Sequence, residues 1–183
     1  MKIIIGGDLG PMRSNRDDFI KAKTENLIDS RVKSILDSSD FRIFNLETPL
    51  ADKEDAIEKN GPSFIAPSNT INGIKALNID FLTLANNHIL DQGEQGLIST
   101  MNVLREAEIA FAGAGNNIKE AQRPYIFENN SIRIGIYCCA EHEFSIATET
   151  TPGANPYDPL VSFDAVRELK KQCEIYETEI LEK

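Results

Sequence analysis

The stretch FLTLANNHILDQG, residues 81–93, decides the fold and locates the first candidate site. Apolar, aromatic and β-branched residues dominate residues 79–85, which predicts a strand with both faces buried. This run ends at Asn86, Asn87 and His88, and His88 is one of only two histidines in the chain. Asparagines are typical of solvated turns, so a pair that directly follows a buried strand needs another explanation.

The sequence on both sides of this stretch alternates between strand and helix patterns. Short apolar runs predict further strands at residues 2–6, 41–47 and 109–113. Apolar residues at helical spacing predict helices over residues 18–36, 69–77 and 93–106. Residues 51–62 are polar and end in Gly-Pro, which predicts a surface excursion or a short helix. The alternation of strands and helices predicts an α/β fold with a mostly parallel sheet and flanking helices.

The last third of the chain has a different pattern. YIFENNSIRIGIYCCA, residues 125–140, predicts a hairpin of two strands around Asn129-Asn130. After a loop at 141–160, Ser162 is a candidate cap for a final helix. That helix carries an apolar stripe formed by Val166, Leu169, Cys173, Tyr176 and Ile180. An α/β protein normally returns such a helix to another strand, so we expect residues 1–183 to be a single domain that forms the N-terminal part of a longer one.

Composition narrows the partners of the chain. Its 183 residues are 41% hydrophobic and 26% charged, an ordinary globular mix, and its net charge is −10. A negative surface repels nucleic acids and anionic lipids. It also repels an anionic small-molecule or polymer substrate unless a bound cation reverses the local charge.

Nothing in the sequence predicts a membrane segment or a disulfide framework. No apolar stretch approaches the ~20 residues that span a bilayer. The apolar run in the N-terminal MKIIIGGD is too short for the hydrophobic region of a signal peptide. The three cysteines include the adjacent pair Cys138 and Cys139, in a setting that indicates reduced thiols in an interior strand. We therefore expect a cytoplasmic protein.

Polar residues follow three of the predicted strands. Asp8 follows the first, Glu47 the second, and Asn86-Asn87-His88 the third. Ligands of open α/β sheets bind beyond the carboxyl ends of the strands. Each residue also has an ordinary interpretation: Asp8 as a turn residue, Glu47 as an exposed loop acid, His88 as a core histidine. Three coincidences at successive strand ends favour one shared site.

The chemistry of such a site is that of a divalent metal. Carboxylate and amide oxygens together with an imidazole suit Mn, Fe or Zn, and soft thiolates are absent from the set. Asp91, three residues after His88, is placed to accept a hydrogen bond from one imidazole nitrogen, which would fix the tautomer and leave the other nitrogen for a reacting group. Alternatively, or in addition, Asp91 caps the following helix.

Four segments resemble a known family. GDLG (7–10), FNLETPL (44–50), LANNHILDQGEQGL (84–97) and AGAGNNIKEAQRP (112–124) are similar to the CapA-type proteins of poly-γ-glutamate capsule synthesis. That family belongs to the calcineurin-like metallophosphoesterase superfamily. The resemblance implies a sandwich of two sheets flanked by helices, with a two-metal site at the strand ends and hydrolysis of a phosphoester or, alternatively, an amide.

The resemblance also implies roles for individual residues. Asp8 matches an aspartate that binds one metal, and Glu47 stands where the superfamily places a bridging aspartate. Asn87 matches an asparagine that binds the second metal. His88 matches the adjacent histidine, which donates a proton or hydrogen bond to the reacting group.

The chain departs from the superfamily pattern in ways that weaken the expected site. The first motif is usually Asp-x-His, but here Gly10 stands in the histidine position. Further histidine motifs that family members carry beyond the equivalent of residue 183 are not in this chain. His142, flanked by Glu141 and Glu143, is the remaining histidine and a weaker candidate for the site. We therefore expect weak metal binding, little hydrolysis by these residues alone, and uncovered apolar surface that favours self-association.

Two other functions compete with the metal-dependent hydrolase. One is a non-catalytic, degenerate form of the same fold that serves as an assembly or polymer-handling partner, and the other is a generic α/β ligand-binding domain. GAGNNI (113–118) follows a strand, but Ile118 occupies the third glycine position of a dinucleotide motif. We therefore expect that segment to form a tight loop into a short helix around 119–122.

Overall fold

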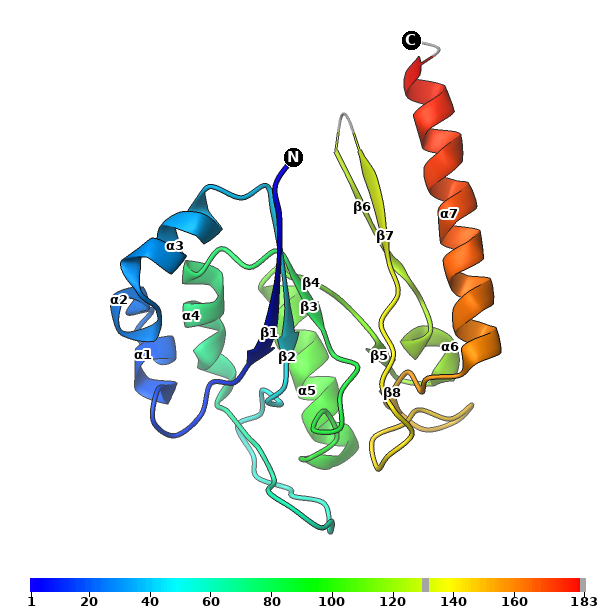
Figure 1. The fold of residues 1–183 in the computed structure, drawn as a ribbon. Helices are drawn as coiled ribbons and strands as arrows, with labels where there is room; N and C mark the ends of the chain where they lie inside the picture. The colour runs from blue at the N-terminus through cyan, green and yellow to red at the C-terminus, as the bar shows by residue number, and fades with distance from the viewer. Residues whose placement is uncertain (130–131, 182–183) are drawn as a thin grey trace.

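A parallel sheet of four strands forms the centre of the protein. The computed structural model describes residues 1–129 and 132–181, with the side chains of the last helix described as far as Glu174. Strands β1 (Ile3–Leu9), β2 (Phe41–Leu46), β3 (Phe81–Thr83) and β4 (Ala110–Ala112) lie side by side in chain order, all parallel (Figure 1). The predicted α/β class with a mostly parallel sheet is confirmed.

Helices cover one face of this sheet. They are α1 (Arg16–Ile20), α2 (Thr24–Leu27), α3 (Ser30–Asp37), α4 (Ile71–Ala76) and α5 (Gly93–Glu106), with the 3-10 helix η1 (Ser68–Thr70) before α4. Leu82 and Leu84 of the β3 segment pack with Ile74 of α4 and Leu97 of α5 in the larger core. Alternate residues of the strands face this core, as the apolar pattern of residues 79–85 predicts.

A hairpin covers the opposite face. Strands β6 (Tyr125–Glu128) and β7 (Arg133–Ile136) are antiparallel, which confirms the predicted hairpin, although Asn130 of its predicted turn lies outside the described residues. Phe127 stacks on Phe41 with ring centroids 4.2 Å apart, and Tyr125 lies 4.9 Å from Phe81. Aromatic contacts of this kind join the hairpin to the parallel sheet as a second layer.

The remaining elements surround the hairpin. Helix α7 (Pro159–Leu181) lies along its outer side (Figure 1), and the Leu169 side chain occupies the space that a side chain at Gly135 would need. The short strands β5 (Ala114–Gly115) and β8 (Gly153–Ala154) pair with each other, and α6 (Ile118–Ala121) follows β5. The short helix predicted around 119–122 is confirmed as α6, but Ala114 and Gly115 of the predicted loop belong to strand β5.

The prediction of one helix over residues 18–36 is wrong. Three short helices occupy the segment, because Ala22 adopts a left-handed φ of 53° after α1 and Ile28 is extended after α2. Asp29 then starts α3 by accepting a hydrogen bond from the Arg31 amide. Val32, one of the apolar residues whose helical spacing predicted the single helix, is 46% exposed. Helical spacing of apolar residues does not reveal breaks in the backbone between them.

The first strand is longer than predicted. It runs to Leu9, with an irregular register between Ile5 and Asp8. Gly6 lies in this irregularity, and a Cβ there would come within 2.1 Å of the Phe44 ring. Glycine therefore lets the aromatic ring of β2 lie against the backbone of β1, and Asp8 lies in the last part of the strand.

The predicted Ser162 cap is also wrong. Helix α7 begins at Pro159, and the Asp158 carboxylate accepts hydrogen bonds from the amides of Leu160 and Val161. Proline is favoured at the first helical position because its missing N–H would have no partner there. Of the predicted stripe, Leu169 is buried but Val166 is 55% exposed, and the side chains of Tyr176 and Ile180 lie outside those described.

The three cysteines are free thiols. Burial raises the pKa of the Cys138 thiol, and the neighbouring Cys139 raises it further, against a hydrogen bond to Thr83 that lowers it. This thiol therefore stays protonated at neutral pH. The cytoplasmic location that reduced thiols suggest stays a prediction.

Candidate functional site

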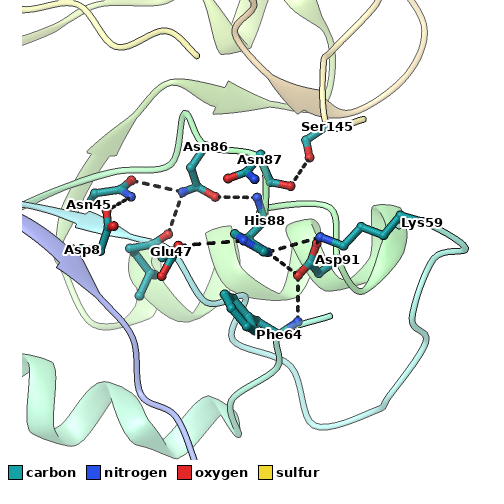
Figure 2. Close-up of polar contacts among 11 residues, drawn as sticks. Asp8, Asn45, Glu47, Lys59, Phe64, Asn86, Asn87, His88, Asp91 and Ser145 are labelled. Atoms are coloured by element: carbon teal, nitrogen blue, oxygen red, sulfur yellow. Dashed lines mark hydrogen bonds and ion pairs between the residues drawn. The ribbon is translucent and has the colours of Figure 1, made fainter. Parts of the chain in front are cut away.

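The ends of β1, β2 and β3 meet at one edge of the sheet and are joined by side-chain amides. The Asn45 amide donates to Asp8 Oδ1 at 2.7 Å, and the Glu47 backbone amide donates to the Leu9 carbonyl. The Asn86 amide donates to Asn45 Oδ1 at 3.1 Å and to the Leu46 carbonyl at 2.9 Å. The sheet thus brings the first two predicted metal ligands to the edge that carries the third (Figure 2).

The two adjacent asparagines have different surroundings. Asn86 is buried, and its Oδ1 accepts from the His88 backbone amide at 3.0 Å, so it fixes the turn after β3. Asn87 is exposed, and its side chain has no hydrogen-bond partner in the described part of the chain. The Asn87 carbonyl accepts from Ser145 Oγ at 2.9 Å. The first asparagine therefore builds the turn, and the second presents an amide at the surface.

His88 and Asp91 form a buried pair. His88 Nδ1 lies 2.7 Å from Asp91 Oδ2, and Asp91 is fully buried while His88 is 9% exposed. Neither a carboxylate oxygen nor a bare imidazole nitrogen can donate, so the proton of this bond belongs to Nδ1. Nε2 is left facing outward, 3.9 Å from Glu47 Oε1. The predicted contact between Asp91 and His88 is present; their catalytic roles stay predictions.

Asp91 does not cap the helix that follows it. Helix α5 begins at Gly93, its N-cap is Gln92, and no side chain caps it. The alternative interpretation of Asp91 as an N-cap is therefore wrong. Its two oxygens are occupied by His88 and by Lys59 and Phe64, which lie 32 and 27 residues away in the chain.

Sequence reasoning missed Lys59 and Phe64. Lys59 Nζ pairs with Asp91 Oδ1 and lies 3.2 Å from His88 Nδ1. The Phe64 backbone amide donates to Asp91 Oδ2 at 2.7 Å, and the Phe64 ring stacks on the His88 ring with centroids 4.1 Å apart. Gly61 and Pro62 indicate a turn that brings this segment back, but no sequence signal distinguishes Lys59 from the exposed Lys53.

The residues that would hold a metal are Asp8, Glu47 and Asn87. Asp8 and Asn87 are exposed, and the Glu47 side chain is 26% exposed, so their oxygens are open to solvent. Two carboxylates and an amide are the donors that hard divalent cations take. No group of three or more His, Cys, Asp and Glu side chains in the described residues is arranged to hold a metal ion. The donors fit a cation in kind and fall short in number, and their role as metal ligands stays a prediction.

His142 does not join this cluster. It lies on an exposed loop with Glu141 and Glu143, and the described residues give its side chain no hydrogen bond or ion pair. The contribution of that loop to the site is the bond from Ser145 to the Asn87 carbonyl. Ser145 was not singled out in the sequence, because a serine in a long loop has no distinguishing signal.

Comparison with known proteins identifies the family of the chain. The family described as "Bacterial capsule synthesis protein PGA_cap" matches residues 2–181. The chain belongs to this family. The match covers nearly every residue, including all the strand ends that carry the candidate site.

Curated relatives in the PGA_cap family share moderate identity with the chain. The "PGA biosynthesis protein CapA" of Bacillus subtilis is 27% identical over 79% of the chain and 39% of its own length. The "Capsule biosynthesis protein CapA" of Bacillus anthracis is 30% identical over 76% of the chain and 35% of its own length. A "Probable polyglutamine synthesis accessory protein" of Mycobacterium tuberculosis is 40% identical over 47% of the chain and 23% of its own length.

The chain matches well under half of the length of these relatives. No helix in the part of the chain that the structure describes is both long and apolar enough to cross a bilayer.

Proposed function

We propose that this chain carries the N-terminal part of a metal-dependent hydrolase of the phosphoesterase type, which acts in capsule or poly-γ-glutamate biosynthesis. The observation that carries the proposal is the buried His88–Asp91 pair, which holds Nε2 at the strand ends beside Glu47. Family membership and the names of the relatives support the link to capsule biosynthesis.

The proposed work of His88 follows from its hydrogen bonds. Asp91 accepts the Nδ1 proton and so fixes the ring and its tautomer. Nε2 is then presented to a substrate oxygen, to accept or donate a hydrogen bond or proton as that oxygen gains or loses charge. General acid–base assistance of this kind contributes about 10²–10⁴-fold to a rate.

Asp8, Glu47 and Asn87 would hold the divalent cations, Mn, Fe or Zn, with a second ion in the longer protein. When bound, such ions would neutralise the negative charge on a phosphoryl group and would lower the pKa of water, so that a nucleophile is present at neutral pH. The positive charge of a bound cation would also help the substrate to bind. A chain of net charge −10 otherwise repels the anionic small-molecule or polymer substrate that capsule chemistry implies.

A second function has specific support. Gly10 stands where the superfamily places a histidine ligand, and one relative is named an accessory protein. These two observations favour a non-catalytic protein of the same fold that handles polymer or assembles with a partner. A protein of that kind has no requirement to bind metal.

An assay with a matched control separates the two functions. The longest natural polypeptide that contains this chain is loaded with Mn²⁺ and given an aryl phosphate. Turnover should fall by about 10²-fold or more in His88→Ala. It should stay unchanged in His142→Ala, whose exposed side chain makes no hydrogen bond or ion pair with the described residues. Absence of turnover together with absence of bound Mn²⁺ would favour the accessory function.

A further inference from the structure

Residues 51–66, here called the strap, connect β2 to η1 and cross the buried side of the His88–Asp91 pair. The ends of the strap are paired, since the Ala51 amide donates to the Ala66 carbonyl at 2.8 Å. Its two arms are attached to the same short segment: the Ile57 amide donates to the Asp91 carbonyl, and Gln92 Nε2 donates to the Phe64 carbonyl. The strap therefore has an irregular backbone but a fixed position.

Lys59 is unusual within the strap. Most of its neighbours from Asp52 to Pro62 are exposed, yet the side chain of Lys59 is only 4% exposed. Taking an ammonium group out of water is unfavourable unless it is paired. Its partner is the fully buried carboxylate of Asp91. An exposed loop thus delivers one charge into the interior, directly behind the proposed catalytic histidine.

The contacts divide the two oxygens of Asp91 between partners. Lys59 takes Oδ1, while Oδ2 accepts from His88 Nδ1 at 2.7 Å and from the Phe64 amide at 2.7 Å. With Oδ1 occupied, the carboxylate cannot rotate to offer that oxygen to the imidazole. The Phe64 ring closes the other side of the histidine by stacking on it. The plane of the His88 ring is then fixed by three strap contacts (Figure 2).

We propose that Lys59 is a positioning residue, which acts through Asp91 to hold the His88 ring and directs Nε2 to the strand ends. The placement of the ring follows from these contacts alone, and its effect on turnover rests on the function proposed above. Lys59 does not touch substrate, because its ammonium group lies on the buried side of the pair, away from the open edge.

The test reads the His88 ring directly. A His142→Gln background leaves His88 as the only histidine, so its ring resonances are assigned without ambiguity. Stacking under Phe64 gives these protons a ring-current shift. In Lys59→Met the shift should be lost, and the amides of Phe64 and Ile57 should exchange with solvent about tenfold faster or more. Lys59→Arg, which keeps the charge, should return both readings toward those of the parent. Lys53→Met, an exposed lysine of the same strap, should change neither.

Several outcomes would overturn the proposal. Lys59→Met with unchanged His88 resonances and unchanged amide exchange would show that the ring is held without Lys59. If Lys59→Met does not fold, Lys59→Gln, which keeps a donor and loses the charge, gives the same two readings. In the longer protein, if it is active, Lys59→Met should lower kcat about tenfold or more and leave KM unchanged. If that protein has no turnover, the proposed function fails, while the resonances and exchange rates still decide the role of Lys59.

Discussion

The two halves of the strand-end site are built in opposite ways. The closed half consists of His88, Asp91 and Lys59, all largely buried and bonded to one another. The open half consists of Asp8, Glu47 and Asn87, whose oxygens face solvent. Among the described residues, the side chains of the open half receive one hydrogen bond, from Asn45 to Asp8, while the bond from Ser145 reaches the backbone carbonyl of Asn87.

This difference separates what the fold supplies from what a ligand must supply. Both oxygens of Asp91, the Lys59 ammonium and His88 Nδ1 all have partners in the protein, which leaves His88 Nε2 as the open position of this half. The geometry of the closed half is therefore set when the chain folds. The open half gathers carboxylate oxygens without donors to match, which is the arrangement a cation would complete. Substitutions in the closed half should therefore affect stability, and those in the open half should affect binding.

The largest expected effect is in the closed half. Asp91→Asn should lower the free energy of unfolding by about 3–5 kcal/mol, because it leaves the Lys59 ammonium buried without its counter-charge. Urea unfolding measures the change. Asp17→Asn is the control, since it removes an exposed pair with Lys21 and should cost no more than about 1 kcal/mol. Equal midpoints for the two variants would mean that the closed half is not a rigid unit.

In the open half, Glu47→Gln should leave stability within about 0.5 kcal/mol while weakening Mn²⁺ binding by roughly tenfold or more. The measurement is the rise in thermal midpoint with added Mn²⁺, which reports binding to the folded state. Glu106→Gln, at an exposed position on α5, should show the same rise in thermal midpoint with added Mn²⁺ as the parent chain. Mn²⁺ that stabilises the parent and the Glu47 variant equally would place the ion elsewhere.

The bulge in β1 tests how firmly the open half is held. Gly6→Ala should cost about 1–3 kcal/mol, because its Cβ meets the Phe44 ring and strains the strand that carries Asp8. Gly7→Ala is matched to it, since no atom lies within 4 Å of a Cβ at that neighbouring position. The measurement is the denaturant midpoint of each of the two variants. A Gly7→Ala variant as unstable as Gly6→Ala would contradict the packing argument.

The smallest effect concerns the base of the strap. The pKa of Asp52 is held below its usual value by hydrogen bonds from the Ser68 hydroxyl and then from the Ser68 amide. A lowered pKa means stability that is present above the unfolded-state value and is lost as the pH falls through the folded-state value. Asp52→Asn should therefore remove part of the decline in stability below about pH 4. Because the carboxylate is exposed, the change should stay under about 1 kcal/mol. Identical pH profiles for variant and parent would show that these bonds contribute nothing.

The sequence predicts the sheet and the strand ends well for a physical reason. Strands buried on both faces must be apolar throughout, and ligands collect where parallel strands end, so Asp8, Glu47 and Asn87 could be placed on one edge. The hydrogen bond between His88 and Asp91 could also be predicted, because a spacing of three residues in a tight turn brings the two side chains together.

Other features depend on contacts that are distant in sequence. Lys59 reaches Asp91 across 32 residues through an irregular strap, and no periodic pattern indicates where such a strap returns. The division of residues 18–36 into three helices depends on the left-handed backbone at Ala22. Alanine rarely adopts this conformation, so the sequence gives no reason to expect it there. The choice of Asp158 over Ser162 as the cap of α7 was decided by Pro159, which favours the first helical position.

The order of the strands bears on how the protein is made. Ile3 pairs with Phe41, Ile43 with Phe81 and Phe81 with Ala110, so each parallel strand finds its neighbour already synthesised. During translation the sheet can grow from its amino-terminal strand, one strand at a time, with no earlier pairing to undo. Assembly can then keep pace with the ribosome, which adds about 5–20 residues each second.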